Sequence, residues 1–516
     1  MKRHSWIRNL FARPIISPFR KRPVRARPAL EALEDRTVPS TFTVTNLLDD
    51  GSVGSMRWAV GQANANPGDD TINFDKTVFA KPQTITLTGT QLELTDTTGT
   101  ETITGPKAGV TVNGGGLSRV FQVESLVTAS ISGLTISGGN AAFGGGLAAY
   151  GGTLTLTNCT VSGNSATIGA GGLFANGGTT TLTSCTVSSN SAGIYGGGMS
   201  TVFSTTTLTD CTVSGNSAAG IGGMSPFGET ITLTNCTISN NSSAGRYLGG
   251  GMQAGEDTLT MTNCTVSGNS NNGGEAAAGL ALVGSASTLT NCTISGNTAT
   301  GSKGIYSNGG GLWTSDAFGF PGATTLTNCT VSGNSTTGGN GGGLANINFG
   351  GAGSTLTLIN CTVKDNSAVA GGGIFNDSTL NVDSSNIIKN TATSAGGGIS
   401  TTGGTAAITN SVINANQVNS SGTALGGGID CQNSTLSLTN CTVNANQANG
   451  TNAYGGGIYA LNSMVTLQSC TVNGNKANSS VIGDGGGIFD PNSVLNLVAT
   501  TVHGNKATTA FDNIGP

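Results

Sequence analysis

Cysteine is the residue type with the most reactive side chain in this chain of 516 residues, which holds eleven of them. Ten recur at one position of a repeated unit, and Cys431 stands apart. Thiols can form disulfides, bind metals or act as nucleophiles. No two cysteines have the two-to-four-residue spacing of a zinc site, and a free cysteine is a good small core residue. We therefore expect buried thiols, with disulfides between neighbouring units or a bound metal as the alternatives.

Carboxylates are the second candidate, because paired carboxylates can act as acid and base on a polysaccharide. Past residue 130 the acidic residues are scattered. Glu229 and the pair Glu256-Asp257 occupy comparable places in adjacent units, and Asp377 with Asp383 forms a weaker pair. The spacing predicts solvated turn residues at all of these positions.

Two pairs of neighbouring aspartates near the N-terminus, Asp49-Asp50 and Asp69-Asp70, could bind Ca²⁺. We expect them to be ordinary loop residues. The two histidines, His4 and His503, lie at opposite ends of the chain. The sequence therefore predicts no catalytic, cofactor-binding or metal-binding residue and no cofactor.

The repeated unit is defined by the cysteine position, which recurs every 24 to 37 residues and is held by Ser in two units and by Thr in the last. Five residues after it an asparagine stands each time. A repeat of this length predicts a solenoid in which each unit packs on its neighbours. The recurring asparagines are Asn164, Asn190, Asn216, Asn241, Asn269, Asn297, Asn334, Asn366, Asn390, Asn416, Asn446, Asn475 and Asn505.

Each unit holds three short strand-like runs, the last of them in the glycine cluster. In the unit 153–173, Leu154 and Leu156 share one face at even positions, whereas Cys159 points inward at an odd position. Side chains alternate with a period of two along a strand. The change of parity therefore requires a bend at Asn158, a residue type that tolerates the left-handed backbone conformation.

Three strands and three corners per unit predict triangular coils, roughly 14 or more, stacked as an all-β parallel β-helix over residues 69–516. Parallel neighbours lie ~4.8 Å apart, so like residues stack on like and the asparagine amides can hydrogen-bond along the axis. Outward threonines such as Thr153, Thr155 and Thr157 form flat ladders. Such a face could bind a polysaccharide or ice, although a plain soluble coat is the expectation.

Residues 41–68 are predicted to cap the first coil. The run 41–45 alternates like a strand. After Ser55, a plausible N-cap, the residues Met56, Ala59, Val60 and Ala63 fall on one face of a short helix. An amphipathic helix here would cover core and backbone groups that the first coil otherwise exposes.

Residues 1–40 differ from the rest in charge. They carry a net charge of +7, which leaves −11 for the remainder of a chain whose total is −4. The weakly charged, acidic body excludes a nucleic-acid partner, which requires a basic face. No stretch reaches the ~18 uninterrupted apolar residues of a membrane-spanning helix. Residues 1–40 are interpreted as a basic targeting or disordered segment.

Two N-terminal stretches resemble segments of bacterial exported proteins. Residues 27–40, RPALEALEDRTVPS, resemble the LExLEDRxxPS-type segment found near the start of many bacterial surface and secreted proteins. Residues 45–74 resemble the module that precedes right-handed β-helices in large bacterial surface proteins, with Met56 and Trp58 departing from its usual residues. These resemblances imply export or cell-surface sorting.

The repeats themselves resemble those of polymorphic outer-membrane proteins, whose motifs are GG-apolar-apolar and F-x-x-N. Residues 328–334, NCTVSGN, followed by 341–344, GGGL, show the pattern, with Val331 at the Phe position. The resemblance covers residues 130–510 and implies a right-handed β-helix of the kind found in surface proteins and adhesins. No autotransporter barrel follows Pro516, so direct membrane insertion is not expected.

Two functions are consistent with these features. The first is a non-catalytic protein that acts as an adhesin, envelope component or glycan-binding scaffold. It would be extracellular or located at the cell surface, where association with the outer membrane is one alternative. Its partner would be a polysaccharide or the surface of a host or neighbouring cell. The alternative is a polysaccharide lyase or glycoside hydrolase of the pectate-lyase-like β-helix type, which would require converging carboxylates and bases.

Overall fold

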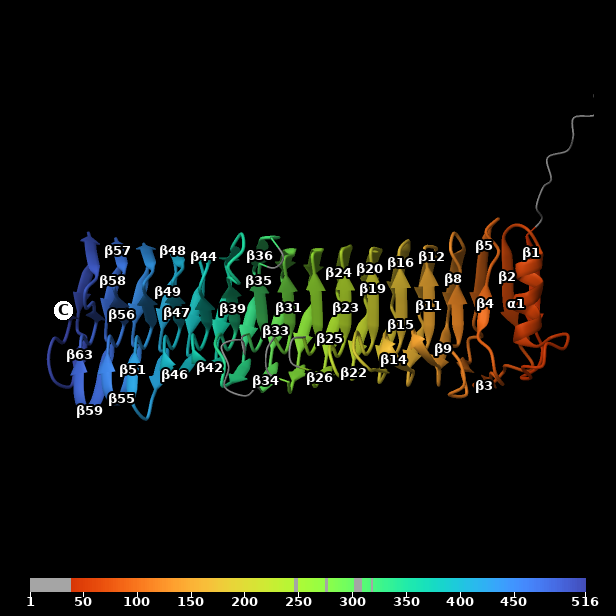
Figure 1. The fold of residues 1–516 in the computed structure, drawn as a ribbon, viewed down its shortest axis with the longest axis horizontal. Coiled ribbons are helices and arrows are strands. Elements are labelled where there is room, and N and C mark those ends of the chain that lie inside the picture. The colour runs from red at the N-terminus through yellow and green to blue at the C-terminus, as the bar shows by residue number, and fades with distance from the viewer. Residues whose placement is uncertain (1–38, 246–248, 274–276, 301–308, 317–318) are drawn as a thin grey trace, which may run out of the picture. The chain divides into compact units, whose positions relative to one another are not determined.

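The computed structural model describes residues 39–245, 249–273, 277–300, 309–316 and 319–516. The predicted segment 1–40 lies outside the described residues except for its last two. Apart from one helix, the described chain is all β, and its strands form four parallel sheets of 17, 15, 16 and 16 strands (Figure 1). The predicted fold class, a parallel β-helix, is confirmed.

One regular coil shows how the sheets arise. Strands β12 (Thr153–Thr157), β13 (Thr160–Ser162), β14 (Ser165–Gly169) and β15 (Leu173–Asn176) follow one another and belong to four different sheets, here called the first, second, third and fourth sheet. Strand β12 pairs in register with β16 (Thr179–Thr183) of the next coil. The prediction of three strands per coil was wrong by one. The missed third-sheet strand is only two residues long in coils such as that of β18 (Ser191–Ala192), too short to show alternation.

The sheets run through nearly the whole described solenoid. The first extends from β1 (Ser40–Val44) to β61 (Val494–Val498), the second from β3 (Gln83–Thr86) to β62 (Thr501–His503), and the third from β10 (Asn140–Phe143) to β63 (Lys506–Ala507). The strands of the fourth sheet are β4 (Leu92–Leu94), β7 (Phe121–Val123), β11 (Leu147–Tyr150), β15, β19 (Met199–Val202), β23 (Met224–Phe227), β27 (Met252–Gly255), β31 (Leu280–Val283), β35 (Leu312–Ser315), β39 (Leu344–Ile347), β43 (Ile374–Asn376), β47 (Ile399–Thr402), β52 (Ile429–Gln432), β56 (Ile458–Leu461), β60 (Ile488–Phe489) and β64 (Ile514–Gly515).

The predicted asparagine ladder is confirmed. Asn164 donates from Nδ2 to Asn190 Oδ1 in the next coil and to Ile136 O in the previous one, each at 3.0 Å, and its backbone N–H donates to the same Oδ1 at 3.0 Å. The same arrangement repeats to Asn505, and all thirteen asparagines are buried. Because every amide donor and acceptor in this column has a partner, burying the polar side chains costs little.

The predicted bend before each cysteine position is also confirmed. Asn158 has φ 51°, and the equivalent residue of every later coil is left-handed too, including Ser184, Asp210 and Ala499. Asparagine is the commonest occupant because it enters this conformation at the lowest cost among non-glycine residues.

All eleven cysteines are buried and free, as predicted. The Sγ atom of Cys185 accepts the backbone N–H of Cys159 at 3.4 Å and donates to the carbonyl of Leu156 at 3.4 Å. Burial raises the pKa of Cys431, the cysteine outside the ladder, to about 11. Because its neutral form is favoured by burial, Cys431 acts as a core group.

The N-terminal helix is confirmed as well. Helix α1 (Met56–Ala65) is capped by Ser55, whose Oγ accepts the N–H of Trp58. Its four predicted apolar residues are all buried in the main core. The helix contacts β1, β2 (Asp70–Phe74) and β4, so it covers the first coil of the solenoid (Figure 1). Strand β5 (Thr100–Thr104) pairs with β2 in the first sheet.

Candidate functional site

A row of side chains on the fourth sheet lies outside the main core, and most of its members are nevertheless shielded from solvent. In β11, Leu147 and Ala149 belong to the main core, whereas Ala148 between them joins a separate cluster with Phe174. The equivalent residues of successive strands stand next to one another, and we call them the recessed row. The row consists of Gln122, Ala148, Phe174, Ser200, Ser225, Gln253, Ala281, Trp313, Ala345, Phe375, Ser400, Asp430, Tyr459 and Phe489.

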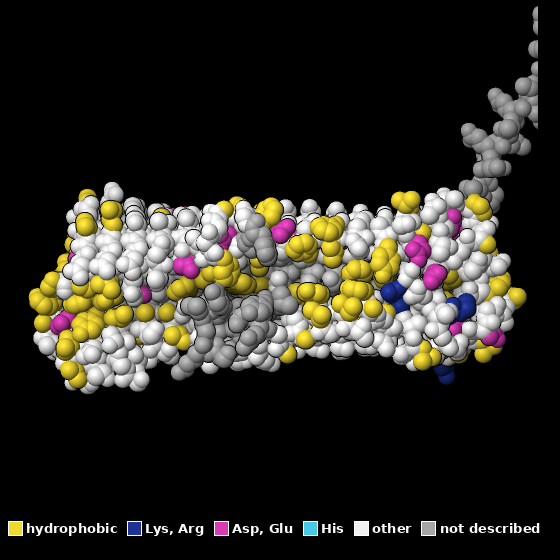
Figure 2. Space-filling model, viewed as in Figure 1, with side chains coloured by type: hydrophobic (Ala, Val, Ile, Leu, Met, Phe, Trp, Pro, Cys, Tyr) yellow, Lys and Arg dark blue, Asp and Glu magenta, His cyan; other side chains and the backbone are white. Residues whose placement is uncertain are grey.

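The recessed row mixes aromatic rings with small polar side chains. Phe174 packs on Phe143 of the third sheet with ring centroids 5.1 Å apart, and on Tyr150 of β11 at 5.9 Å. Farther along, Trp313 packs edge-on against Phe349 at 5.7 Å, and Tyr459 stacks on Phe489 at 6.0 Å. Figure 2 shows hydrophobic side chains gathered on this face, over the elements from β11 to β23 and again near the C-terminal coils.

A pocket of about 500 Å³ opens on the row from β15 to β27. Its aromatic residues come from both sheets that border it, and Tyr195 and Phe227 are 44% and 42% exposed. Gln253 also lines the pocket, and its Oε1 atom is buried without a hydrogen-bond partner in the described part of the chain. The lining residues are Phe143, Gly169, Phe174, Tyr195, Ser200, Val202, Ile221, Ser225, Pro226, Phe227, Gln253 and Gly255.

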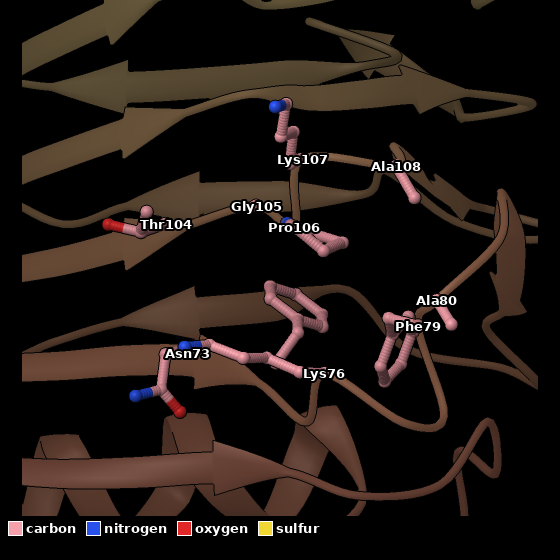
Figure 3. A pocket seen from close by; sticks show the side chains of 10 residues that line it. Asn73, Lys76, Phe79, Ala80, Thr104, Gly105, Pro106, Lys107 and Ala108 are labelled. Carbon is pink, nitrogen blue, oxygen red and sulfur yellow. The ribbon is translucent and has the colours of Figure 1, made fainter.

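A second cleft of about 750 Å³ lies in the first coils, between the turn after β2 and the loop after β5. Phe74 and Phe79 pack edge-on at 5.0 Å on one side and Pro106 lies on the other (Figure 3). Lys76 extends along the lower side toward Asn73, whereas Lys107 stands on the opposite loop and points away. Both lysines are exposed. Asn73 of β2 also lines the cleft, and its Oδ1 is buried without a hydrogen-bond partner among the described residues.

Glu229 and Asp257 of two adjacent coils are buried, which corrects the prediction that they are solvated turn residues, whereas Glu256 is half-buried. Glu229 and Asp257 are 7% and 3% exposed, and Asp257 Oδ1 accepts the backbone N–H of Glu229 at 2.8 Å. Thr201 donates to Glu229 Oε1 at 2.6 Å, while Glu229 Oε2 and Asp257 Oδ2 have no hydrogen-bond partner among the residues that the structure describes. Burial raises the pKa of both carboxyl groups to about 7.

The place of these two acids in the repeat explains their burial. They immediately precede β24 (Thr230–Thr234) and β28 (Thr258–Thr262), at a corner that Ser204 and Ser285 hold in neighbouring coils. Asp257 N donates to Ser285 Oγ just as Glu229 N donates to Asp257. The acids therefore occupy an inward ladder position. Their partner Thr201 lies in the strand that also carries Ser200 of the row, so the alternation along β19 directs the acids to the opposite side of the sheet from the pocket.

This buried pair predicts a pH-dependent stability. A raised folded-state pKa means that the folded protein keeps protons that the unfolded chain releases. The contribution of these carboxyl groups to the free energy of unfolding is therefore fully present below about pH 4 and is lost as the pH rises through about 7. Glu229→Gln is expected to raise the free energy of unfolding at pH 8 by about 1–3 kcal/mol and to flatten the profile. Melting temperatures between pH 5 and 8 test this. Asp210→Asn, at an exposed corner where other coils hold Asn, is the control and should leave the profile unchanged.

The structure does not bring Asp377 and Asp383 together. Asp377 precedes β44 (Thr379–Asp383) and Asp383 ends it; Asp383 is half-buried and accepts hydrogen bonds from Thr409 and Asn410. Asp377 instead accepts the backbone N–H of Asn348 and holds a loop in place. Burial raises the pKa of Asp377 to about 6.

One aspartate of each N-terminal pair is buried in the fold, and Asp50 and Asp69 are exposed. Asp49 forms an ion pair with Arg57 at 2.9 Å and accepts the N–H of Thr88 at 2.7 Å. Asp70 is buried and accepts the Nδ2 of Asn66 at 2.8 Å. No group of three or more His, Cys, Asp and Glu side chains is placed to hold a metal ion anywhere in the described ranges.

Three further observations complete the comparison with the sequence. His503 is exposed on β62, and His4 lies outside the described residues. The sequence analysis missed the recessed row, including the buried Asp430, whose carboxylate accepts from Ser400 Oγ and Gln432 Nε2. It also missed Glu101, whose pKa burial raises to about 7.

Among the described residues no helix is long and apolar enough to span a bilayer.

The architecture is that of a parallel β-solenoid. Columns of stacked polar and apolar side chains fill its interior, and its fourth sheet carries the recessed row with its aromatic rings. Sequence comparison names the family. The family model described as "Right handed beta helix region" matches residues 102–253, 171–351 and 278–463, which together cover more than half of the chain. This chain belongs to the right-handed β-helix family. No curated protein matches it.

Solved structures with a similar fold include proteins of different kinds. Pectate lyase Pel9A is 12% identical over 61% of this chain and 78% of its own, with a TM-score of 0.34. The Vag8–C1 inhibitor complex matches at 10% identity over 93% of this chain and 95% of the other, with a TM-score of 0.38. PfbA, a surface adhesin of Streptococcus pneumoniae, is 10% identical over 89% and 92%, with a TM-score of 0.24. At these TM-scores the likenesses carry no argument about activity.

Proposed function

We propose that this protein is a non-catalytic extracellular or cell-surface β-helix that binds a glycan on its fourth sheet. The observation that carries the proposal is the pocket of about 500 Å³ on the recessed row, where aromatic rings and uncharged polar groups meet. A sugar ring presents apolar C–H groups on its faces and hydroxyl groups at its edges, so it matches a site of this composition. Export is supported by the resemblance of residues 27–40 to a sorting segment.

The row also runs along the solenoid axis, a direction that a linear polymer could follow. Its residues repeat along the solenoid axis at ~4.8 Å per coil. Aromatic rings recur beyond the pocket, at Trp313 and Phe375. A linear polymer lying parallel to the axis would therefore meet similar surfaces in successive coils. A small compact ligand would use the pocket alone.

A polysaccharide-cleaving enzyme is the second candidate, and the pair Glu229 and Asp257 is the feature that favours it. Two adjacent carboxyl groups with raised pKa values resemble an acid/base pair. Both groups, however, are buried at an inward position and bonded to the backbone and to Thr201. A substrate in the pocket would lie on the other side of the fourth sheet from them, so the non-catalytic function is preferred.

The test separates binding from turnover. The full chain is incubated with a panel of neutral and acidic polysaccharides, and both the retained glycan and new reducing or unsaturated chain ends are measured. We expect retention of at least one glycan with no new chain ends. Retention should fall for Phe227→Ala and persist for Met464→Ala, an exposed apolar residue of the first sheet. New chain ends, or no retained glycan in the panel, would contradict the proposal.

A further inference from the structure

We propose that Asp70 and Glu101 share one proton and act as a pH-sensitive switch for the opening of the N-terminal layer, which we define as residues 40–74. This layer comprises β1, α1 and β2, and it lies on β5 at one end of the solenoid (Figure 1). The inference is independent of the glycan-binding function proposed above. It depends on the register of the two acids, on their burial without a cation, and on the hydrogen bonds that attach the layer to Asp70.

The two acids stand next to one another at an inward position of the first sheet. Asp70 of β2 and Glu101 of β5 are register partners, and each is 1% exposed. The two following coils hold apolar residues of the main core at this position, Ala129 and Leu154. Because paired parallel strands lie ~4.8 Å apart, the two carboxyl groups are within reach of each other.

One oxygen of each carboxyl group lacks a hydrogen-bond partner among the described residues, namely Asp70 Oδ2 and Glu101 Oε2. Two ionised carboxylates can only accept hydrogen bonds, so in that state neither oxygen could satisfy the other. A proton on Glu101 Oε2 turns this atom into a donor to Asp70 Oδ2. One proton then gives both oxygens a partner, and it leaves a single negative charge where two adjacent buried charges would repel each other.

No cation of the described chain stabilises the ionised pair. The one ion pair between described residues joins Arg57, the only charged residue of α1, to Asp49. Asp96, in the loop before β5, is 7% exposed, and its backbone N–H donates to Glu101 Oε1 at 2.9 Å. Burial, followed by the charges of Asp96 and Asp70, raises the pKa of Glu101 to about 7. The other charged side chains on β1, β2, β4, β5, β8 (Thr128–Ser132) and the loops that join α1 to β2 and β4 to β5 are acidic and exposed: Asp69 and Glu93.

Asp70 attaches both elements of the layer that precede it in the sequence. Its Oδ1 accepts a hydrogen bond at 2.8 Å from Nδ2 of Asn66, the C-cap residue of α1. The same oxygen accepts the backbone N–H of Ser40, where β1 begins, at 3.3 Å. Loss of the shared proton therefore places a repelling charge next to the residue that holds α1 and β1.

The direction of the pH effect follows from the two states of the layer. Opening exposes Glu101 to water, where its pKa returns to the ordinary value of 4.5. Because the pKa in the closed form is raised to about 7, the closed form keeps a proton that the open form releases. The stabilisation of the closed layer is therefore full below about pH 4.5 and is lost as the pH rises through about 7.

The experiment measures hydrogen exchange of the full chain by mass spectrometry from pH 5 to pH 8.5, with each rate divided by the intrinsic rate at the same pH. We expect the protection of residues 40–74 to fall about tenfold or more over this range. Glu101→Gln places an amide N–H where the protonated oxygen stands, so it should abolish the fall. Asp70→Asn removes the second charge and should reduce the fall. Glu93→Gln, an exposed neighbour on β4, is the control and should leave the fall unchanged.

Three results would overturn the inference. The first is protection of the layer that does not change with pH, and the second is a fall that survives in Glu101→Gln. The third is a fall abolished by Glu93→Gln, which would place the titrating group at the surface. Circular dichroism establishes that each variant is folded. If Glu101→Gln does not fold, Asp70→Asn decides, because an undiminished fall in that variant contradicts the shared proton.

Discussion

Replacing Asn334 by alanine is expected to destabilise the solenoid by about 3–5 kcal/mol, because several buried groups lose their partners at about 1–3 kcal/mol each. The Oδ1 of Asn334 accepts from the backbone N–H of Asn297 at 3.0 Å and from its Nδ2 at 2.9 Å. Its Nδ2 donates to Ile294 O at 2.9 Å and to Asn366 Oδ1 at 3.0 Å. Alanine removes all four bonds and leaves a cavity that is too small and too enclosed to be refilled by neighbours.

The measurement is urea unfolding combined with hydrogen exchange, since a solenoid can open region by region. The matched control is Asn328→Ser in the same coil. Asn328 is an exposed corner residue with φ 55°, and Ser184 and Ser384 already hold the equivalent place. The control should cost under about 1 kcal/mol. Equal losses of unfolding free energy for the two variants would show that the asparagine ladder stabilises the solenoid no more than an exposed corner residue does.

Gly343→Ala is the second change with a large expected effect, about 3 kcal/mol or more. A Cβ atom at this position would lie 2.7 Å from Gly373 O and 2.9 Å from the Nδ2 of Asn366. Neither can move without separating the coils or breaking the asparagine ladder, so the cost exceeds that of ordinary overpacking. The equivalent residue is glycine in all thirteen coils, from Gly146 to Gly487.

The control for this prediction is Gly333→Asn. Gly333 has φ 63° and open space around its Cα, and Asn240 already occupies the equivalent position with φ 54°. Its cost should be small, because asparagine tolerates this conformation. Thermal melting of the two variants gives the comparison. A tolerated Gly343→Ala would mean that the coils are less tightly stacked than the structure shows.

Most of the fold could be predicted because every coil repeats the same sequence pattern. The parity change at Asn158, the spacing from Cys159 to Asn164 and the four apolar residues of α1 are local signals that the structure confirms. Parallel stacking then places each of them over its equivalent. The third sheet was missed because strands as short as Ser191–Ala192 carry no alternation of their own.

The candidate site could not be predicted for a different reason. Residues such as Ala148, Phe174 and Gln253 share no residue type, so the repeat does not mark the row as a functional column. Their recess depends on how the third and fourth sheets meet, which no local pattern encodes. Glu229 and Asp257 were taken for solvated residues because turn positions are usually exposed, whereas their corner faces inward.

The claim on which all of this depends is that equivalent residues of successive coils lie in axial register, even where the repeat is longest. Thr288 and Thr325 are 37 residues apart, both project from the first sheet, and they are register partners on β32 (Ala286–Thr290) and β36 (Gly322–Thr327). Because all native thiols are buried, cysteines introduced at these two sites can be labelled selectively with pyrene. The account predicts strong excimer fluorescence from the 288/325 pair and none from a 288/381 pair, three coils apart. Excimer emission from the distant pair, or its absence from the adjacent one, would contradict it.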